Sequence, residues 1–272
     1  MSDIQSGVRL VCGWCKAQNA QSATTCDTCG APLDAAKRVS DSGWREAPRL
    51  RDMTEFHFGS STCQVEGEIV PVAEINLAAG DWVFFEHHTL LWKDEHLELD
   101  TLPTDGGMKR AFGGMPFMVT IARGPGRLAV SRDNTGEMVT LPLHPHEELD
   151  VRGHAFLLAT HAISYSFVRI KGLKNILHGG EGLYLDRFVA QGEQGLVVLH
   201  GYGNVFERVL GAGESILVEP GGFLYKDASV TMDTEQQKLK TSMFGGQSLW
   251  LAKLTGPGRV GIQSMYHHHE TD

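Results

Sequence analysis

The string FGGMPFMVTIARGPGR at residues 112–127 returns as FGGQSLWLAKLTGPGR at residues 244–259, an offset of 132 residues. Halfway between the two copies, HGG at residues 178–180 is followed by the apolar run LYLDRFVA and a looser glycine turn at residues 192–195. A fixed internal period is typical of proteins built from repeated structural units. The sequence therefore predicts three units with a period of 66 residues.

A second motif repeats with compatible spacing. The segment GDWVFFEHHTLLWKD at residues 80–94 aligns with GESILVEPGGFLYKD at residues 213–227, and glycine, glutamate, leucine, lysine and aspartate positions are shared. The corresponding middle segment, EELDVRGHAFLLAT at residues 147–160, is degenerate. Glu86 and Glu219, like Asp94 and Asp227, recur at equivalent positions, which indicates structural roles.

Within each unit, short runs rich in valine, isoleucine, leucine and aromatic residues alternate with clusters of glycine, proline, aspartate and asparagine. This pattern indicates strands joined by turns. The GPGR strings predict β-hairpins, because glycine adopts positive φ and proline fixes a bend. One unit alone would leave apolar faces and strand edges uncovered. We therefore expect an all-β fold of three ~66-residue β-sandwich repeats in a pseudo-threefold arrangement, with helix only in brief turns.

Three segments point to a known family: GGEGLYLDRF at residues 179–188, FEHHTLLWKD at residues 85–94 and GPGRVGIQSM at residues 256–265. Residues 53 to 266 resemble the family named for altered inheritance of mitochondria. The resemblance implies a β fold similar to that of the trp RNA-binding attenuation protein. Mitochondrial members are associated with inner-membrane organisation, which favours a scaffold, and the resemblance supplies no catalytic residues.

The amino-terminal segment VCGWCKAQNAQSATTCDTCGAPL at residues 11–33 holds two cysteine pairs. Cys12 and Cys15 form the first pair, Cys26 and Cys29 form the second, and ten residues separate the pairs. Two thiolates on each tight turn can meet at one tetrahedral ion, and a loop this small cannot fold on apolar burial alone. The sequence predicts one structural Zn²⁺ on these four residues.

The order Cys15-x3-Asn19-x6-Cys26-x2-Cys29 resembles the Ran-binding-protein type of zinc finger over residues 8–33. That family carries a tryptophan two residues before the first ligand, where this chain has Leu10, and Trp14 stands inside the first turn instead. The positions that bind ubiquitin in some members hold Lys16 and Ala17, so ubiquitin binding is not implied.

Trp14 and Asn19 are the candidate partner-binding residues of this finger. Trp14 either stacks on an RNA base or caps the small zinc core, and Asn19 either contacts a partner or satisfies backbone groups of the loop.

We expect a zinc finger at residues 1–33, a flexible linker at residues 34–52, a three-repeat body at residues 53–266 and a disordered tail at residues 267–272. No apolar run is long enough to span a bilayer, and no signal peptide precedes the cysteines, which favours a cytoplasmic protein. Cys63 is expected to be a strand residue without chemistry.

The formal net charge of -9 disfavours binding to nucleic acid or anionic membranes. A metalloenzyme of the cupin type would use His144 and His146, with Asp150 and residues 223–226 as further ligands, but the spacing departs from the cupin pattern. We expect His87 and His88 to be solvated turn residues and the histidines at 267–269 to belong to the tail.

The sequence therefore predicts a non-enzymatic scaffold or adaptor, in which the zinc finger recruits a protein partner to a β-repeat platform. The prediction allows for a homo-oligomeric platform. A single-stranded RNA-binding protein is the first alternative, and a cupin-like metalloenzyme is the second.

Overall fold

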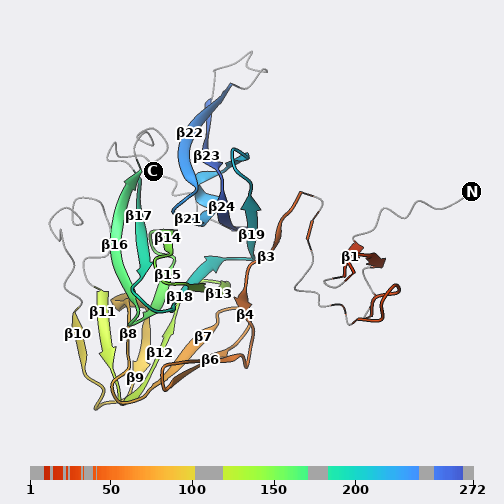
Figure 1. The fold of residues 1–272 in the computed structure, drawn as a ribbon. Helices are drawn as coiled ribbons and strands as arrows, with labels where there is room; N and C mark the ends of the chain where they lie inside the picture. Colours follow the sequence, from red (N-terminus) through yellow and green to blue (C-terminus); the bar gives the residue numbers. More distant parts are fainter. Residues whose placement is uncertain are drawn as a thin grey trace, which may run out of the picture.

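The computed structural model describes residues 9–12, 15–20, 23, 25–31, 33, 39–40, 42–101, 119–170, 183–238 and 248–265 (Figure 1). The FGG and HGG motifs, Trp14 and the histidines at 267–269 lie outside these residues.

The described part of the chain is almost entirely β, as the sequence predicts. Two 3₁₀ turns, η2 (His87–Thr89) and η3 (Pro220–Gly222), are its helical elements. The strands before the repeats are β1 (Arg9–Val11), β2 (Gln18–Ala20), β3 (Arg45–Glu46), β4 (Arg49–Leu50), β5 (Glu55–Phe58) and β6 (Ser61–Glu66).

The remaining strands fall into three consecutive groups of six, which we call repeats 1, 2 and 3. Repeat 1 contains β7 (Val72–Leu77), β8 (Trp82–Glu86), β9 (Leu90–Lys93), β10 (Leu99–Thr101), β11 (Val119–Arg123) and β12 (Gly126–Ser131). Repeat 2 contains β13 (Gly136–Leu143), β14 (Glu148–Arg152), β15 (Phe156–Thr160), β16 (Ile163–Ile170), β17 (Leu183–Ala190) and β18 (Gly195–Tyr202). Repeat 3 contains β19 (Val205–Leu210), β20 (Ser215–Val218), β21 (Phe223–Asp227), β22 (Thr231–Lys238), β23 (Ser248–Thr255) and β24 (Gly258–Gln263).

The same antiparallel pairing recurs in each repeat. The sixth strand pairs with the first and third: β12 with β7 and β9, β18 with β13 and β15, and β24 with β19 and β21. The fifth strand pairs with the second and fourth: β11 with β8 and β10, β17 with β14 and β16, and β23 with β20 and β22. Each repeat thus splits into two three-stranded halves.

Two junctions join halves of consecutive repeats into longer sheets. Strand β8 of repeat 1 pairs with β15 of repeat 2, and β14 of repeat 2 pairs with β21 of repeat 3. The resulting sheets have the strand orders β5-β6-β7-β12-β9 (first sheet), β10-β11-β8-β15-β18-β13-β4 (second sheet), β16-β17-β14-β21-β24-β19-β3 (third sheet) and β20-β23-β22 (fourth sheet). A closed arrangement would need β20 to pair with β9, and no such pairing joins the described strands.

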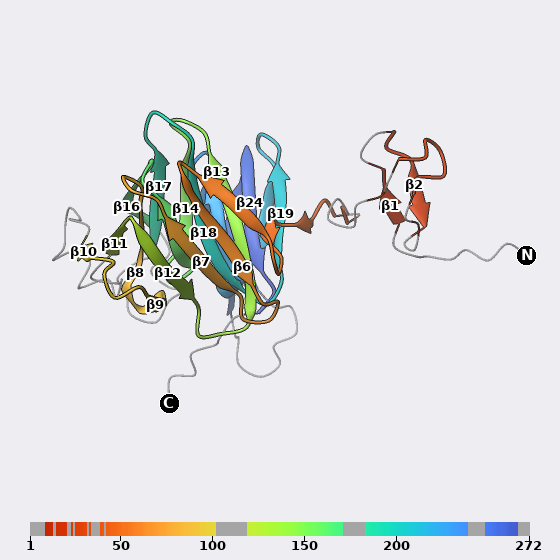
Figure 2. The same cartoon turned by 90° about the horizontal axis from the view of Figure 1, so that it is seen from below.

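One apolar core lies between each successive pair of the four sheets. Figure 2 shows strands of the first three sheets lying over one another. One cluster includes Ile75 of the first sheet and Phe85 of the second, and a second includes Phe84 of the second sheet and Phe188 of the third. The third cluster includes Val260 of the third sheet and Leu254 of the fourth. The layering of the sheets does not test the predicted pseudo-threefold arrangement of the repeats, which stays a prediction.

The layered arrangement explains the continuous apolar runs in the sequence. Strands exposed on one face alternate apolar and polar residues, but strands buried on both faces do not. The five residues of β15, FLLAT, are all buried, and Val83 and Phe84 of β8 point into different cores.

The GPGR strings form turns, but the predicted hairpins are wrong. Strand β11 belongs to the second sheet and β12 to the first, so the turn between them crosses from one layer to the next. The turn passes close to neighbouring backbone: a Cβ on Gly124 would lie 2.1 Å from the Ala78 carbonyl oxygen, and one on Gly256 would lie 2.4 Å from that of Gly211. Glycine is needed here for close approach rather than for a two-stranded hairpin.

Part of the expected linker is docked on the body. Strand β3 pairs with β19, and β4 pairs with β13, so residues 45–50 bridge the edges of the third and second sheets. The Ala47 amide donates to the Val205 carbonyl at 3.0 Å, and the Thr140 amide donates to the Pro48 carbonyl at 3.0 Å. We call residues 45–50 the strap.

Candidate metal centre

Two similar turns bring the four amino-terminal cysteines together. In the first turn the Lys16 amide donates to the Cys12 carbonyl at 3.0 Å, and in the second the Gly30 amide donates to the Cys26 carbonyl at 2.8 Å. Lys16 and Gly30 occupy the same turn position, with φ of 60° and 69°. Strands β1 and β2 pair with each other beside the first turn. The regular spacing of the cysteines therefore produces two equivalent turns.

The sulfur positions fit a tetrahedral metal ion. The four ligand atoms of Cys12, Cys15, Cys26 and Cys29 lie within 4.8 Å of one another. Cys12 and Cys29 are 3.6 Å apart at sulfur, and Cys15 and Cys26 are 3.5 Å apart. Zinc–sulfur bonds of ~2.3 Å in a tetrahedron place sulfurs ~3.8 Å apart, whereas a disulfide needs ~2 Å. The cluster can hold one metal ion.

The thiol pKa values show why a cation suits this site. Hydrogen bonding from the Cys29 backbone lowers the pKa of Cys26 to about 6. The Ala31 backbone hydrogen bond lowers the pKa of Cys29, but the neighbouring sulfurs of Cys15, Cys12 and Cys26 outweigh it and raise that pKa to about 12. One thiolate thus forms readily, and further ones need a positive ion beside them.

Asn19 has a structural position in this module. Its side chain is 2% exposed. The amide nitrogen donates to the Ala17 carbonyl at 2.9 Å, and the amide oxygen accepts the Asp27 backbone N–H at 2.8 Å. Asn19 therefore connects the second turn to the segment after the first turn. This agrees with the alternative that Asn19 satisfies backbone groups of the loop. Its role toward a partner stays a prediction, and so does that of Trp14.

A second group of possible metal ligands lies between repeats 1 and 2. Glu86, His88 and His154 place their ligand atoms within 4.8 Å of one another, and the His88 and His154 rings are 6.3 Å apart. Arg132 lies in the middle of this group: its Nη1 is 3.2 Å from Glu86 Oε2 and 2.9 Å from His88 Nε2. Because a guanidinium only donates hydrogen bonds, His88 Nε2 is the acceptor and its proton resides on Nδ1.

The electrostatics of this group agree with that assignment. Burial lowers the pKa of His88 to about 4, and the positive charge of Arg132 adds to the effect. The pKa of His154 is lowered for the same two reasons. Both imidazoles are therefore neutral near pH 7, and Arg132 balances the charge of the buried Glu86. A metal ion here would have to displace Arg132.

The sequence did not identify this group. Glu86 has the structural role predicted for it, and His87 and His88 are exposed turn residues, as predicted. The contact between His88 and Arg132, which is 44 residues away in sequence, was not predicted. A signal existed in the 66-residue period: His154 occupies the repeat 2 position that corresponds to His88. This correspondence is hard to recognise from the sequence, because the repeat 2 copy of the motif, residues 147–160, is degenerate.

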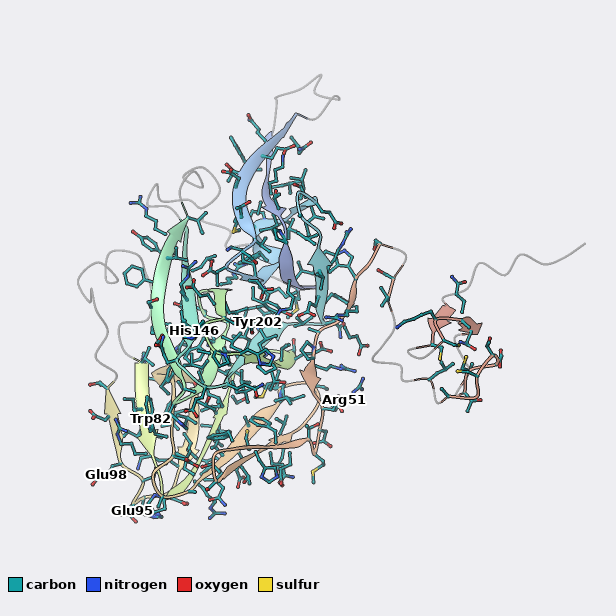
Figure 3. The ribbon with its side chains drawn as sticks, in the orientation of Figure 1. Arg51, Trp82, Glu95, Glu98, His146 and Tyr202 are labelled. Carbon is teal, nitrogen blue, oxygen red and sulfur yellow. The ribbon has the colours of Figure 1, made fainter. Side chains whose placement is uncertain are left out.

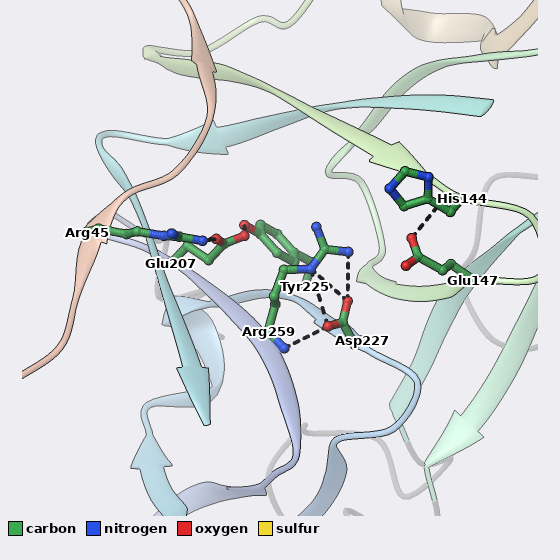
Figure 4. A network of polar contacts seen from close by, with 7 residues as sticks. All are labelled: Arg45, His144, Glu147, Glu207, Tyr225, Asp227 and Arg259. Atoms are coloured by element: carbon green, nitrogen blue, oxygen red, sulfur yellow. Dashed lines mark hydrogen bonds and ion pairs between the residues drawn. The ribbon is translucent and has the colours of Figure 1, made fainter. Parts of the chain in front are cut away.

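His144 and His146 lie in the turn between β13 and β14. The His144 amide donates to Glu147 Oε2 at 2.9 Å (Figure 4). His146, which is labelled in Figure 3, adopts a φ of 70°. Neither belongs to a group of three clustered metal-ligating side chains in the described part of the chain. Asp150, the third cupin-type candidate, is instead fully buried and bound to Arg187 and Lys226.

The recurring aspartates have one shared structural role, as predicted. Asp94 Oδ2 accepts the Arg127 backbone N–H at 2.9 Å, and Asp227 Oδ2 accepts that of Arg259 at 2.7 Å. Each aspartate thereby fixes the turn that enters the sixth strand of its repeat, and Figure 4 shows the contact of Asp227 with Arg259. Cys63 is fully buried, and burial raises its pKa to about 12, which fits a residue without chemistry.

A third polar group anchors the strap. Glu207 is 2% exposed and accepts the Tyr225 hydroxyl at 2.8 Å and Arg45 Nε at 3.2 Å (Figure 4). Burial, followed by the negative charge of Glu207, raises the pKa of Tyr225. Arg45 of the strap therefore compensates a carboxylate buried in the body.

The comparisons with known proteins agree with this architecture. Residues 63–265 match the family model described as mitochondrial biogenesis AIM24. A crystal structure of a Streptococcus pyogenes protein superimposes with a TM-score of 0.57 at 20% identity, covering 76% of this chain and 94% of that chain. At that identity the likeness shows the fold alone. No curated protein matches the chain. Among the described residues, no helix has the length and apolar character needed to cross a membrane.

Proposed function

Because this chain belongs to the family described as mitochondrial biogenesis AIM24, we propose that it is a non-enzymatic scaffold or adaptor. A zinc-bound amino-terminal module recruits a protein partner, and the β body provides a rigid platform. The observation that carries the proposal is the four-cysteine cluster, whose sulfurs are spaced for one tetrahedral ion.

The burial of the cysteines supports a recognition role for the module. Cys12 and Cys26 are buried, whereas Cys15 and Cys29 are exposed. Zinc at this cluster would hold the two turns in fixed positions, since metal binding and folding are coupled in modules of this size. A small surface fixed in this way suits binding to another macromolecule better than chemistry.

The polar groups of the body support the platform role. Asp150 is paired with Arg187 and Lys226, and Glu207 with Arg45 and Tyr225. Glu86 is paired with Arg132 in the same manner. General acid–base chemistry needs a carboxyl or imidazole that reaches a substrate, and these carboxylates are committed to contacts between strands and repeats. We therefore assign no catalytic step to them.

We place the adaptor in a reducing compartment, the cytoplasm, because its closest sulfur pairs are arranged for a metal and not for disulfides. The family description refers to mitochondrial biogenesis, so fractionation of cells that produce the full chain tests this location directly. Recovery in the mitochondrial matrix would contradict it.

The proposal is tested by comparing the intact chain with a Cys26→Ser/Cys29→Ser variant. We expect one zinc ion per intact chain by metal analysis and none in the variant. We also expect a defined protein to co-purify with the intact chain, to rebind when both are purified, and to be lost with the variant. Cys63→Ala is the matched control, since Cys63 lies in the core away from the cluster.

The same experiment separates the alternatives. RNA that is retained by the intact chain, lost in the variant and released by salt would favour a nucleic-acid-binding protein over an adaptor. Absence of zinc from the intact chain would contradict the proposal at its first step.

A further inference from the structure

Consecutive repeats are joined by two junctions with the same strand pairing, and two strand edges are available for a third junction. At each junction, the second strand of one repeat pairs antiparallel with the third strand of the next: β8 with β15, and β14 with β21. The second strand of repeat 3, β20, and the third strand of repeat 1, β9, each end a sheet and have one partner among the described strands.

The burial of these strands differs sharply between the junctions and the two edges. The three central residues of β8 and of β14 are buried, as are all five of β15 and the first four of β21. By contrast, no residue of β9 is buried, and β20 has one buried residue, Val218. Strand positions that are buried at the two junctions are therefore largely unburied at β9 and β20, where the series of repeats begins and ends.

The side chains left uncovered at the edges are apolar. Leu91 is 57% exposed and Trp92 is 37% exposed on β9, and Leu217 is 41% exposed on β20. Leu91 and Trp92 correspond to Leu157 and Leu158 of repeat 2 and to Leu224 and Tyr225 of repeat 3, all fully buried. Leu217 corresponds to Phe84 of repeat 1, which is also fully buried.

The buried counterparts show where the exposed side chains belong. Leu157 and Leu158 of repeat 2 pack in the core of repeat 1, and Leu224 and Tyr225 of repeat 3 pack in the core that contains Phe188 of repeat 2. Phe84 of repeat 1 packs in that same repeat 2 core. Each junction therefore exchanges apolar side chains between neighbouring cores. Within the described part of the chain, Leu91, Trp92 and Leu217 have no neighbouring repeat to receive them.

We propose that two copies of this chain associate head to tail, with β20 of one copy pairing antiparallel with β9 of the next. The registers of the internal junctions, Phe85 opposite Leu158 and Val151 opposite Tyr225, set the register of the new one. Transferred to the edges, they place Val218 opposite Trp92 and Leu217 opposite Lys93. The fourth sheet of one copy and the first sheet of the next become one continuous sheet.

The composition of the edges favours this pairing. Exposed edge strands are commonly protected by charged residues, proline or bulges. Strand β20 has the sequence SILV, without charge or proline, and β9 has the sequence LLWK with a single charge. A head-to-tail contact of this kind builds a closed ring if its rotation closes and a filament if it does not.

The first test is the mass of the full-length protein by light scattering and by sedimentation over a range of concentrations. We expect the wild type to form multimers and Leu217→Lys to sediment as a monomer that keeps the circular dichroism spectrum of the folded chain. Val209→Lys is the matched control, because Val209 is 58% exposed on β19, outside both edges, and this variant should assemble as the wild type does. A wild type that remains monomeric at all concentrations would overturn the proposal.

The second test establishes the direction of the contact. Leu217→Lys retains an intact β9, and Trp92→Lys retains an intact β20, so each variant alone should be monomeric and their mixture should give a one-to-one dimer. Dimers of either single variant would instead indicate a symmetric contact. The test is independent of zinc and of the proposed adaptor role, since both variants retain all four cysteines.

A crosslink distinguishes association from closure within one chain. Cysteines introduced at Leu217 and Lys93 should join separate chains into a ladder of multimers on oxidation. If the oxidised product keeps the mass of one chain, β20 pairs with β9 of the same molecule and the proposal is wrong.

Discussion

At the scale of single residues, buried charges are placed beside groups that fix their protonation. Glu86 is 1% exposed, and Arg132, 6% exposed, lies within 3.2 Å of it. Removing one partner of a buried ion pair leaves a charge without compensation, which costs more than the pair contributes. The Glu86–Arg132 pair should therefore be sensitive to single substitutions and tolerant of a double one.

Arg132→Met should lower the free energy of unfolding by about 3 kcal/mol, because the buried Glu86 carboxylate loses its guanidinium partner. Glu86→Gln in the same chain should restore most of this loss. Urea denaturation followed by circular dichroism measures both variants. Equal stability of the single and double variants would show that Glu86 does not depend on Arg132.

His200 should make the stability of the body depend on pH. It is 1% exposed, and burial followed by the charge of Arg132 lowers its pKa from 6.5 to about 4. As the pH falls, His200 of the unfolded chain binds a proton near pH 6.5, whereas His200 of the folded chain binds one only near pH 4. The contribution of neutral His200 to the free energy of unfolding is therefore present above pH 6.5 and is lost as the pH falls to 4. Between pH 7 and 4 the wild type should lose about 3 kcal/mol more than His200→Gln.

The control for this measurement is His57→Gln, because the His57 side chain is 69% exposed. Its pH profile should follow that of the wild type. A His200→Gln profile parallel to the wild-type profile would contradict the assignment.

At the scale of strands and sheets, the junctions between repeats carry both apolar and ionic contacts. Asp150 of β14 accepts Lys226 Nζ of β21 at 2.7 Å across the second junction, and it also binds Arg187 Nε at 2.7 Å. Burial alone would raise the pKa of Asp150, but hydrogen bonds from Arg187 and Lys226, together with the charges of these two residues, outweigh it and lower this pKa. The first junction has Phe84 at the position of Asp150. The same backbone pairing therefore accommodates an apolar side chain at one junction and an ion pair at the other.

Asp150→Asn should lower the free energy of unfolding by about 3 kcal/mol, since Lys226 is left buried without a carboxylate. The double variant Asp150→Leu/Lys226→Met should recover most of that loss, because it makes this junction apolar like the first one. Thermal and urea unfolding of the two variants test the point. If the double variant is less stable than Asp150→Asn, the ion pair stabilises the fold by more than the cost of burying its charges, and the prediction is wrong.

The sequence predicts strands and turns better than it predicts their partners. The 66-residue period locates equivalent residues such as Asp94 and Asp227, because their contacts are local to one repeat. The GPGR hairpins were wrong because the same turn residues serve a crossing between sheets, and only the path of the whole chain decides between the two. The Glu86–Arg132 contact was missed because it joins residues 46 apart that share no motif.

At the scale of the whole molecule, the amino-terminal module and the body are stabilised by different means. The body has three apolar clusters between four sheets. The module has few buried residues in its described part, namely Cys12, Asn19 and Cys26. The spacing of the four cysteines was sufficient to predict this cluster from sequence, because ligand geometry is set by short turns and not by a distant fold.

Removal of metal should therefore affect only the module. After chelation we expect amide hydrogens of residues 9–31 to lose protection from exchange, while those of residues 119–170 keep it, because metal ligation replaces a core in the former. Hydrogen exchange read by mass spectrometry follows both regions in one sample. Loss of protection throughout the body would show that the metal stabilises the whole chain.

The strap has a consequence for the order of events during synthesis. Glu46 of β3 leaves the ribosome 160 residues before Phe206, its partner in β19. At ~5–20 residues per second, this corresponds to ~8–30 seconds during which β3 has no strand to join, although β4 of the strap can pair with β13 earlier. The junctions, in contrast, link consecutive repeats and can form as each repeat emerges. We expect the Ala47 amide to be among the last to gain protection in pulse-labelled nascent chains, so that the earliest part of the body to be made is the last to be fastened.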